Sequence, residues 1–296
     1  MKNLLIIGGS KFAGKSFVNY FNVEKKYKDL NIIIISRKKN KNIKKIKNIK
    51  FIKKDFKNIR YLPECDFIFY CLRTSSLRSD TRLFKLFAKK IIKLKKKPKI
   101  IFTSSGVLYG LNNKKIKITE RNKISIKNTK QLENYKKRWF RQKLNLENLF
   151  YSLSKKKFKI VVLRMFSFIG PSLLGQNYAS SDFIKSSKQK KNIIINGPVN
   201  TYRSYLYEKD FVEWIIKIFY KFDNSYEIFN FGSDKPITLY NLANKIRNYF
   251  KSNDIILLNN SKKVDYYVPS IDKLKKKFKL KINVNLNKAI LKSIIK

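Results

Sequence analysis

Histidine is absent from this chain, and cysteine occurs only twice, at Cys65 and Cys71. Zinc sites are built mainly from cysteine and histidine at characteristic short spacings. The two cysteines lie on either side of a predicted strand and lack that spacing. We therefore expect no zinc or other metal site. So few cysteines also favour the reducing cytoplasm over an oxidising compartment.

Long apolar runs are missing as well. Ile32 to Ile35 and Ile193 to Ile195 have the length of a strand, far short of the roughly 20 residues that cross a bilayer. The apolar start, Met1 to Ile7, ends in Gly8 and Gly9, whereas a signal peptide would end in a small-residue cleavage site. The sequence predicts a soluble protein without a membrane span, in which Met1 to Ile7 forms the first strand.

Acidic residues are scarce: 19 aspartates and glutamates stand against 69 lysines and arginines, which gives a formal charge of +50. Such a charge is typical of proteins that bind nucleic acid or anionic surfaces, with affinities that fall steeply with salt. Coding bias is the other explanation, because Ile, Asn, Phe and Tyr are also abundant. The lysines gather before strands and at helix ends, as in residues 93–99, 155–159 and 273–281. We favour coding bias, with non-specific attraction to polyanions as its side effect.

Short apolar runs alternate with helix-length stretches in the first half of the chain. The runs are rich in β-branched and aromatic residues and predict strands at Leu4 to Ile7, Ile32 to Ile35, Phe51 to Ile52, Phe67 to Tyr70, Ile100 to Thr103 and Ile160 to Arg164. Such strands suit a parallel sheet that is buried on both faces. We predict an α/β fold, a Rossmann-type doubly wound parallel sheet with a smaller C-terminal lobe.

A glycine-rich turn, GGSKFAG, follows the first predicted strand. Gly8 permits a tight turn, and Gly14 lets the next helix pack close to the strand. The helix that begins near Gly14 would offer its N-terminal amides and its dipole to a pyrophosphate. An ordinary strand-to-helix turn is the alternative, but the flanking strands and helix favour a dinucleotide site. We expect the cofactor to contact Gly8, Gly9, Lys11, Phe12 and Gly14.

The second predicted strand ends in Ser36, Arg37 and Lys38. A dinucleotide fold that prefers NAD usually has an acid here, which accepts hydrogen bonds from the ribose hydroxyls. A cationic pair instead suits the 2′-phosphate of NADP, although chance is an alternative in so lysine-rich a chain. We expect NADP or NAD as cofactor, with NADP favoured and with Ser36 and Arg37 beside the ribose.

Further segments follow the turn in a fixed order. They are TSSGVLYG, LRMFSFIGP, RSYLYEKD, FNFGSDKPITLYNLA and YVPS. With them the whole chain resembles the extended short-chain dehydrogenase/reductase family, and within it the NAD-dependent epimerase/dehydratase group that modifies nucleotide sugars. The resemblance implies an NAD(P)-binding domain in residues 1–166, a substrate-binding lobe mainly in 167–296 with segments that return to the sheet, and a homodimer.

The resemblance also implies roles for individual residues. The cofactor would be contacted by Asp55 and Phe56 at its adenine and by Cys71 and Leu72 along its groove. Arg203 would hold the substrate pyrophosphate with its planar guanidinium, and a surface salt bridge is the alternative role. Ser167 stands where the family commonly has an asparagine near the substrate.

The active-site helix departs from the family pattern. The family has a tyrosine that moves a proton and, one turn later on the same helix face, a lysine; a serine or threonine orients the reacting hydroxyl. Here Ser105 and Lys143 match, and Lys143 would also bind the cofactor, but Trp139 stands in the place of the tyrosine. An indole N–H donates a hydrogen bond and cannot accept a proton.

Three interpretations of this helix are open. Tyr135, one turn before Trp139, could present its hydroxyl if the helix were shifted. Alternatively, Trp139 truly replaces the base and leaves a weak or altered catalyst that relies on Ser105 and hydride positioning. In the third interpretation the protein keeps the fold, binds its ligands and has lost the chemistry. For Tyr135 and Trp139 themselves, the alternative to any such role is that they are plain core aromatic residues.

The reaction type is also open. Family 4,6-dehydratases commonly have an Asp-Glu pair after the active-site serine or threonine, whereas Gly106 and Val107 follow Ser105. We expect an epimerase or keto-sugar reductase of a nucleotide-activated sugar, with hydride transfer at C4, for surface-polysaccharide sugars; a 4,6-dehydratase-like enzyme is less favoured. An impaired member that binds RNA or another polyanion is the alternative from another class, because Lys11 replaces the usual middle glycine and resembles the GGxRFxG turn of atypical RNA-binding members.

Overall fold

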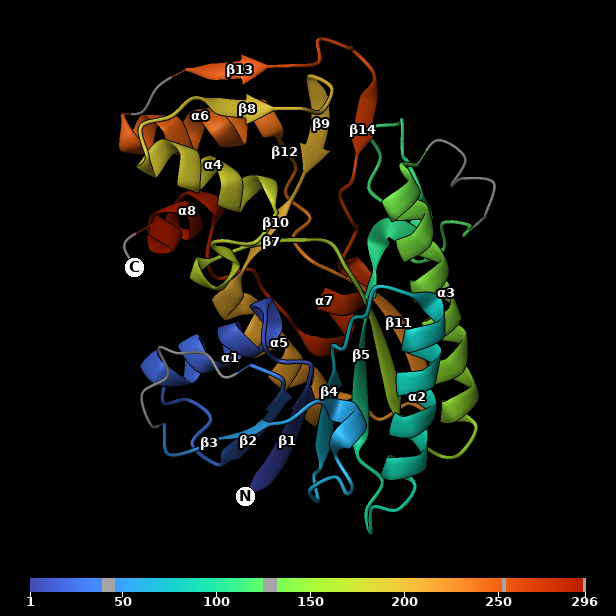
Figure 1. Ribbon diagram of the computed structural model, residues 1–296. Helices are drawn as coiled ribbons and strands as arrows, with labels where there is room; N and C mark the ends of the chain where they lie inside the picture. The colour runs from blue at the N-terminus through green and yellow to red at the C-terminus, as the bar shows by residue number, and fades with distance from the viewer. Residues whose placement is uncertain (39–45, 125–131, 252–253, 295–296) are drawn as a thin grey trace. The chain divides into compact units, whose positions relative to one another are not determined.

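The computed structural model describes residues 1–38, 46–124, 132–251 and 254–294 (Figure 1). They form two compact units, each of which combines separate stretches of the chain. The first unit consists of Met1–Leu108, Glu133–Arg164 and Val212–Phe229. The second unit consists of Tyr109–Leu132, Met165–Phe211 and Asn230–Lys296.

A seven-stranded sheet forms the centre of the first unit. Its strands are β1 (Lys2–Ile7), β2 (Leu30–Ser36), β3 (Ile49–Lys53), β4 (Phe67–Tyr70), β5 (Lys99–Ser105), β6 (Ile160–Met165) and β11 (Tyr226–Phe231). They lie in the order β3-β2-β1-β4-β5-β6-β11, and β1 pairs in parallel with both β2 and β4. The six predicted strands and the Rossmann-type doubly wound fold are therefore confirmed. The strand order reverses at β1 and β4, where such sheets bind ligands at the carboxyl ends of the strands.

Helices cover both faces of this sheet. α1 (Phe12–Val23) and α5 (Glu208–Lys221) lie on one face, and α2 (Leu77–Ile91) and α3 (Asn134–Ser154) lie on the other (Figure 1). Aromatic rings fill the space beneath α2 and α3. The ring of Phe102 on β5 stacks on Phe150 of α3 with 4.4 Å between centroids, and Tyr70 of β4 lies 4.8 Å from Phe87 of α2. Because such rings bury large apolar areas, they fix both helices against the sheet.

A buried ion pair also ties α3 to the sheet. Glu147 of α3 accepts hydrogen bonds from Nε and Nη2 of Arg164 on β6, at 3.1 and 2.8 Å. The hydroxyl of Ser104 on β5 donates to the same carboxylate at 2.5 Å. All three residues are at most 5% exposed. The pair therefore holds α3 in one register against β5 and β6.

Among its described residues, the second unit contains three small sheets. β7 (Ser167–Ile169) pairs with β10 (Tyr205–Tyr207), β8 (Ile193–Ile195) pairs with β13 (Ile255–Leu257), and β9 (Asn200–Arg203) lies between β12 (Ile237–Thr238) and β14 (Val264–Tyr266). The helices are α4 (Ala179–Lys188), α6 (Leu239–Phe250), α7 (Asp272–Phe278) and α8 (Leu286–Ile294). The buried carboxylate of Asp210 accepts hydrogen bonds from the backbone N–H groups of Asn283 and Val284 and so fixes the segment that leads into α8.

Within the described ranges, the helices are too short or too polar to cross a membrane. The 21-residue helix α3 is the longest of them, and charged side chains run along it. The same part of the chain contains no group of three cysteine, aspartate or glutamate side chains that could hold a metal ion.

Candidate functional site

The glycine-rich turn joins β1 to α1 at the carboxyl end of the sheet. Gly8 has a φ of +96°, and a Cβ at this position would lie 2.8 Å from the carbonyl oxygen of Cys71 and from the nitrogen of Leu72. A Cβ at Gly14 would lie 2.0 Å from the carbonyl oxygen of Gly9. In both places the obstacle is backbone, so only glycine fits. The tight turn and the close helix packing expected from these glycines are both present.

The start of α1 suits an anion. The helix begins at Phe12, just after the exposed Lys11, and its first turn contains no acidic residue. Its N-terminal amides and its dipole therefore favour a phosphate. A small cavity beside the turn is lined by Gly9, Ser10, Gly14, Lys15, Val18, Lys38 and Phe51. The turn fits a dinucleotide, because the absence of a Cβ at position 14 lets the start of α1 pack directly on the backbone of Gly9, which brings its N-terminal amides close to the end of β1.

Side chains at the end of β2 are partly engaged in local contacts. The hydroxyl of Ser36 is buried and donates to the carbonyl oxygen of Lys38 at 2.7 Å. Arg37 is exposed next to it. Of the predicted ribose contacts, the guanidinium of Arg37 therefore has the freer position for a phosphate, and the Ser36 hydroxyl would first have to leave its carbonyl partner.

Asp55 and Phe56 lie at the short 3₁₀ turn η1 (Phe56–Asn58), after β3. The carboxylate of Asp55 accepts a hydrogen bond from the N–H of Lys57 at 3.1 Å. The ring of Phe56 is 3% exposed and lies 6.4 Å from the ring of Phe87 in the core. Only the backbone of Phe56 is therefore left to face an adenine, whereas the Asp55 side chain is at the surface of the turn.

Cys71 and Leu72 directly follow β4. The Cys71 thiol donates to the carbonyl oxygen of Ile7 at 3.2 Å, and burial raises the pKa of the thiol to about 12. The thiol is therefore protonated at neutral pH and is no nucleophile there. Because the backbone atoms of Cys71 and Leu72 closely approach Gly8, both residues border the glycine-rich turn.

Lys143 and Ser105 both lie near the end of β5. The Nζ of Lys143, whose side chain is buried, donates to the carbonyl oxygen of Thr103 at 2.6 Å. Ser105 is the last residue of β5, and its buried hydroxyl accepts a hydrogen bond from the N–H of Val107 at 3.2 Å. Of the three predicted catalytic residues, Ser105 thus ends β5 and Lys143 reaches the same strand from α3.

Burial lowers the pKa of Lys143 from 10.5 to about 8. The carboxylate of Asp80 opposes this shift, and the guanidinium of Arg73 adds to it. The Lys143 side chain is therefore mostly protonated at pH 7, and this pH is only about one unit below its pKa. A group in this state can release and regain a proton near neutral pH.

Trp139 lies one helical turn before Lys143 on α3. The guanidinium of Arg73, which is exposed after β4, covers the Trp139 ring at 4.7 Å from its centroid. The indole Nε1 is buried and has no hydrogen-bond partner among the described residues. Tyr135 lies two turns before Lys143, about 12 Å along the helix axis, and is 51% exposed beside Lys136. The structure therefore brings Trp139 to Lys143 and leaves Tyr135 apart, so that a catalytic Tyr135 stays a prediction that requires α3 to shift.

In the second unit, Arg203 of β9 is held in an ion pair. Its Nη2 donates to Oδ2 of Asp265 at 2.7 Å, and its guanidinium lies 5.5 Å from the centroid of the Tyr267 ring. The two charged side chains are 21% and 22% exposed. To hold a pyrophosphate, Arg203 would exchange Asp265 for the ligand. Ser167 begins β7 and is half-buried.

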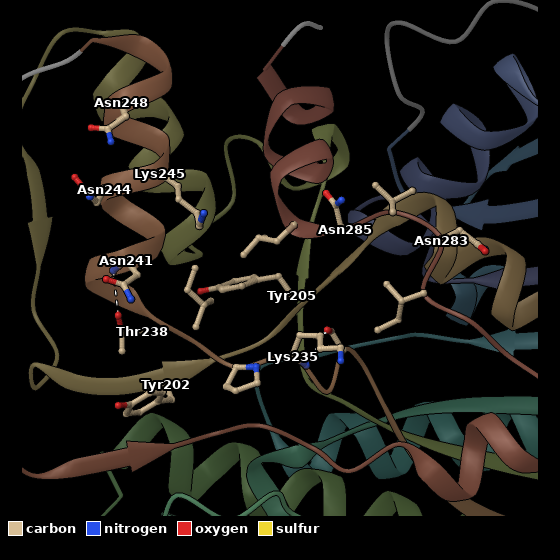
Figure 2. Close-up of a pocket in the computed structure, with 16 residues that line it drawn as sticks. Tyr202, Tyr205, Lys235, Thr238, Asn241, Asn244, Lys245, Asn248, Asn283 and Asn285 are labelled. Atoms are coloured by element: carbon tan, nitrogen blue, oxygen red, sulfur yellow. Dashed lines mark hydrogen bonds between the residues drawn. The ribbon is translucent and has the colours of Figure 1, made fainter.

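A cavity of about 1080 Å³ lies within the second unit (Figure 2). Helix α6, the segment before α8 and strand β10 supply its polar walls, which include Asn241, Asn244, Lys245, Asn248, Asn283, Asn285 and Tyr205. Asn244 has a buried Oδ1 without a partner among the described residues. Neither Arg203 nor Ser167 lines the cavity. Amides both donate and accept hydrogen bonds, so these walls suit a polar ligand.

Sequence reasoning missed two charged residues near Lys143. The buried carboxylate of Asp80 accepts hydrogen bonds from the hydroxyl of Thr74 at 2.7 Å and from Nε2 of Gln142 at 2.9 Å. The sequence did offer one sign of Asp80, because an acidic residue on the apolar face of a helix is unusual in so basic a chain. Arg73 gave none, because one arginine among 69 basic residues does not stand out.

Lys143→Met is expected to stabilise the protein near pH 7. Because the folded chain binds fewer protons than the unfolded chain between pH 8 and 10.5, the lysine destabilises the folded state fully below pH 8 and progressively less above it. The shift from 10.5 to about 8 corresponds to roughly 3 kcal/mol, less about 1 kcal/mol for the lost hydrogen bond to Thr103.

Urea unfolding at pH 7 and at pH 10 measures this effect. The gain in the free energy of unfolding should be clear at pH 7 and should shrink at pH 10. Lys85→Met, at an exposed position of α2, is the matched control and should change little at either pH. A variant at position 143 that is less stable than the wild type at pH 7 would contradict the burial argument.

Comparisons with known proteins agree with the motifs. Residues 4–232 match the model of the NAD dependent epimerase/dehydratase family. A relative, Uncharacterized protein MJ1055 of Methanocaldococcus jannaschii, is 25% identical over 283 residues, which cover 84% of this chain and 81% of the relative.

Solved structures share the fold. A dTDP-glucose 4,6-dehydratase of Bacillus anthracis in complex with NAD superposes with a TM-score of 0.82 at 17% identity, covering 99% of this chain and 96% of the other. A UDP-glucose 4-epimerase of Thermotoga maritima with UDP-glucose gives 0.79 at 19% identity, covering 99% and 97%. The resemblance inferred from the motifs is confirmed, and the chain belongs to the NAD dependent epimerase/dehydratase family.

Proposed function

We propose that the protein is an NAD(P)-dependent enzyme that epimerises or reduces a nucleotide-activated sugar. The observation that carries this proposal is the turn at Gly8 and Gly14, which has no room for a Cβ and lies at the same edge of the sheet as Ser105 at the end of β5, where Lys143 of α3 contacts Thr103. A nicotinamide dinucleotide bound there would supply hydride transfer at a sugar carbon. The turn would hold its pyrophosphate and Asp55 its adenine.

The chain's own residues would then manage the proton. Ser105 would orient the reacting hydroxyl, and Lys143 would bind the cofactor ribose. Trp139 cannot accept a proton, whereas Lys143 has a pKa of about 8 and lies one turn away. We therefore assign the proton transfer to Lys143, and we expect a lower reaction rate than in an enzyme with a tyrosine at position 139.

Finer parts of the proposal rest on single features. The exposed Arg37 after β2 supports NADP over NAD. Arg203 would hold the substrate pyrophosphate and Ser167 would lie near the sugar, both in the second unit. The resemblance to the family supports a homodimer and a role in making surface-polysaccharide sugars, and the scarcity of cysteine supports a cytoplasmic location. In the related solved structures the ligands are UDP-glucose and NAD, which makes them the first probes to try.

Trp139→Tyr tests the assignment of the chemistry. Restoring a phenol one turn before Lys143 should raise the rate of hydride transfer roughly 100-fold, the usual contribution of a positioned acid or base. The rate is followed by nicotinamide absorbance and by NMR of the sugar, with UDP-glucose or dTDP-glucose and either cofactor. Trp139→Phe keeps a ring without the hydroxyl and should show no gain. A tyrosine variant no faster than the phenylalanine variant would contradict the assignment.

A further inference from the structure

Arg73, Trp139 and Lys143 form a cluster of hydrogen-bond donors at the carboxyl ends of β4 and β5. The Arg73 guanidinium lies 4.7 Å from the centroid of the Trp139 ring, and Lys143 lies one turn further along α3. Arg73 directly follows Leu72, whose nitrogen would lie 2.8 Å from a Cβ at Gly8. The cluster therefore borders the turn to which we assign the cofactor pyrophosphate.

None of the three side chains is paired with a carboxylate in the described part of the chain. Lys143 donates to a backbone carbonyl, Arg73 rests on an aromatic face, and the Trp139 Nε1–H is buried without a partner. A guanidinium, an indole and an ammonium all donate and never accept. Nearly all buried donors in proteins find an acceptor, so the free indole N–H indicates that the acceptor comes from a ligand.

The chemistry of the cluster selects the kind of ligand group. A sugar hydroxyl both donates and accepts, and between the Arg73 guanidinium and the Trp139 indole it would leave its own proton without a partner. An ionised carboxylate only accepts, and a guanidinium binds it through two parallel hydrogen bonds. The charge also matches, because the buried Asp80 carboxylate offsets only one of the two cations near this strand end and leaves a net positive charge from Arg73 and Lys143. The Arg73 side chain is exposed, so a ligand can reach it.

We propose that Arg73 and the Trp139 indole N–H bind a carboxylate of the substrate, so that the substrate is a nucleotide-activated sugar acid. This inference rests on the proposed function and narrows it. Arg73 is then the residue that determines specificity. The Trp139 indole N–H only donates, so it selects groups that accept a hydrogen bond, whereas a tyrosine hydroxyl would bind donors as well. The glycine-rich turn would still hold the cofactor pyrophosphate and Lys143 would still move the proton, whether or not the sugar has a carboxylate.

UDP-glucuronate and UDP-glucose are the matched probes, because they differ only at C6, which is a carboxylate in the first and a hydroxymethyl group in the second. The chain has two tryptophans, so a ¹H–¹⁵N correlation NMR spectrum shows two indole N–H signals, and the Trp139→Phe variant identifies which of them belongs to Trp139. With NADP⁺ present, UDP-glucuronate should move the Trp139 signal downfield and leave that of Trp214 in place. It should also bind at least about tenfold more tightly than UDP-glucose.

Arg73→Gln should remove both the signal shift and the difference in affinity. Arg78→Gln, at an exposed position of α2, is the control and should change neither. Equal affinities with an unmoved Trp139 signal would overturn the carboxylate site and leave the proposed function standing. If neither nucleotide sugar binds, sodium acetate at constant ionic strength is the second probe. A Trp139 shift that Arg73→Gln abolishes would still support the carboxylate site, and no shift would overturn it.

Discussion

Replacing Gly14 with alanine is expected to abolish the binding of NADP⁺ and NAD⁺ and to lower the free energy of unfolding by about 2 kcal/mol or more. The new Cβ would lie 2.0 Å from the carbonyl oxygen of Gly9, and this obstacle is backbone, which cannot turn aside as a flexible side chain would. Helix α1 would have to move away from β1, and its N-terminal amides would leave the position that suits a pyrophosphate.

Calorimetric titration with each dinucleotide and urea unfolding measure the two effects. Ser10→Ala is the control, because Ser10 is exposed in the same turn. It should keep both cofactor binding and stability. If Gly14→Ala bound dinucleotide as tightly as the wild type, the turn would not be the cofactor site.

Glu147→Leu is expected to lower the free energy of unfolding by about 3 to 5 kcal/mol. The variant leaves Arg164, 5% exposed, as a buried charge without its carboxylate, and it removes the acceptor of the Ser104 hydroxyl. Because the ion pair fixes α3 against β5 and β6, the positions of Trp139 and Lys143 should loosen with it. Cofactor affinity should therefore fall as well.

The double variant Glu147→Leu with Arg164→Leu tests whether the loss of stability comes from the unpaired charge of Arg164 or from packing at position 147. Replacing both partners of a buried ion pair by apolar residues is often neutral or stabilising. The double variant should therefore recover most of the stability that the single variant loses, as measured by urea unfolding. A double variant no more stable than Glu147→Leu would show that packing at position 147, rather than an unpaired charge, sets the effect.

The strands and the glycine-rich turn could be predicted because their evidence is local. Ile32 to Ile35 and Phe67 to Tyr70 are continuous apolar runs, which suit strands covered on both faces. Gly8 and Gly14 stand at the end of such a run and are explained by backbone contacts within the turn and with the end of β4. A pattern of neighbouring residues is enough to indicate features of this kind.

Features that depend on distant partners could not be predicted. The contact between Arg73 and Trp139 joins two elements that only the sheet order brings together. Arg203 was expected to be available for a pyrophosphate, but its partner Asp265 lies 62 residues further along the chain. No local pattern marks such a pair in a chain where lysine and arginine are so common.

The small sheets of the second unit are equally hard to foresee. β8 has three residues, and it pairs with the equally short β13, which begins at Ile255. The side chains around the cavity come from α6, β10 and the segment before α8, and these lie far apart in sequence. The sequence therefore indicated a second lobe without showing how its parts assemble.

Titration of the purified protein with NADP⁺ and NAD⁺ at physiological salt, with structured RNA as competitor, tests the central claim most directly. The account predicts that NADP⁺ binds, that it binds more tightly than NAD⁺, and that RNA does not displace it. Arg37→Ser should reduce the preference for NADP⁺. A net charge of +50 makes RNA the fair competitor. Tight RNA binding without binding of either dinucleotide would contradict the account.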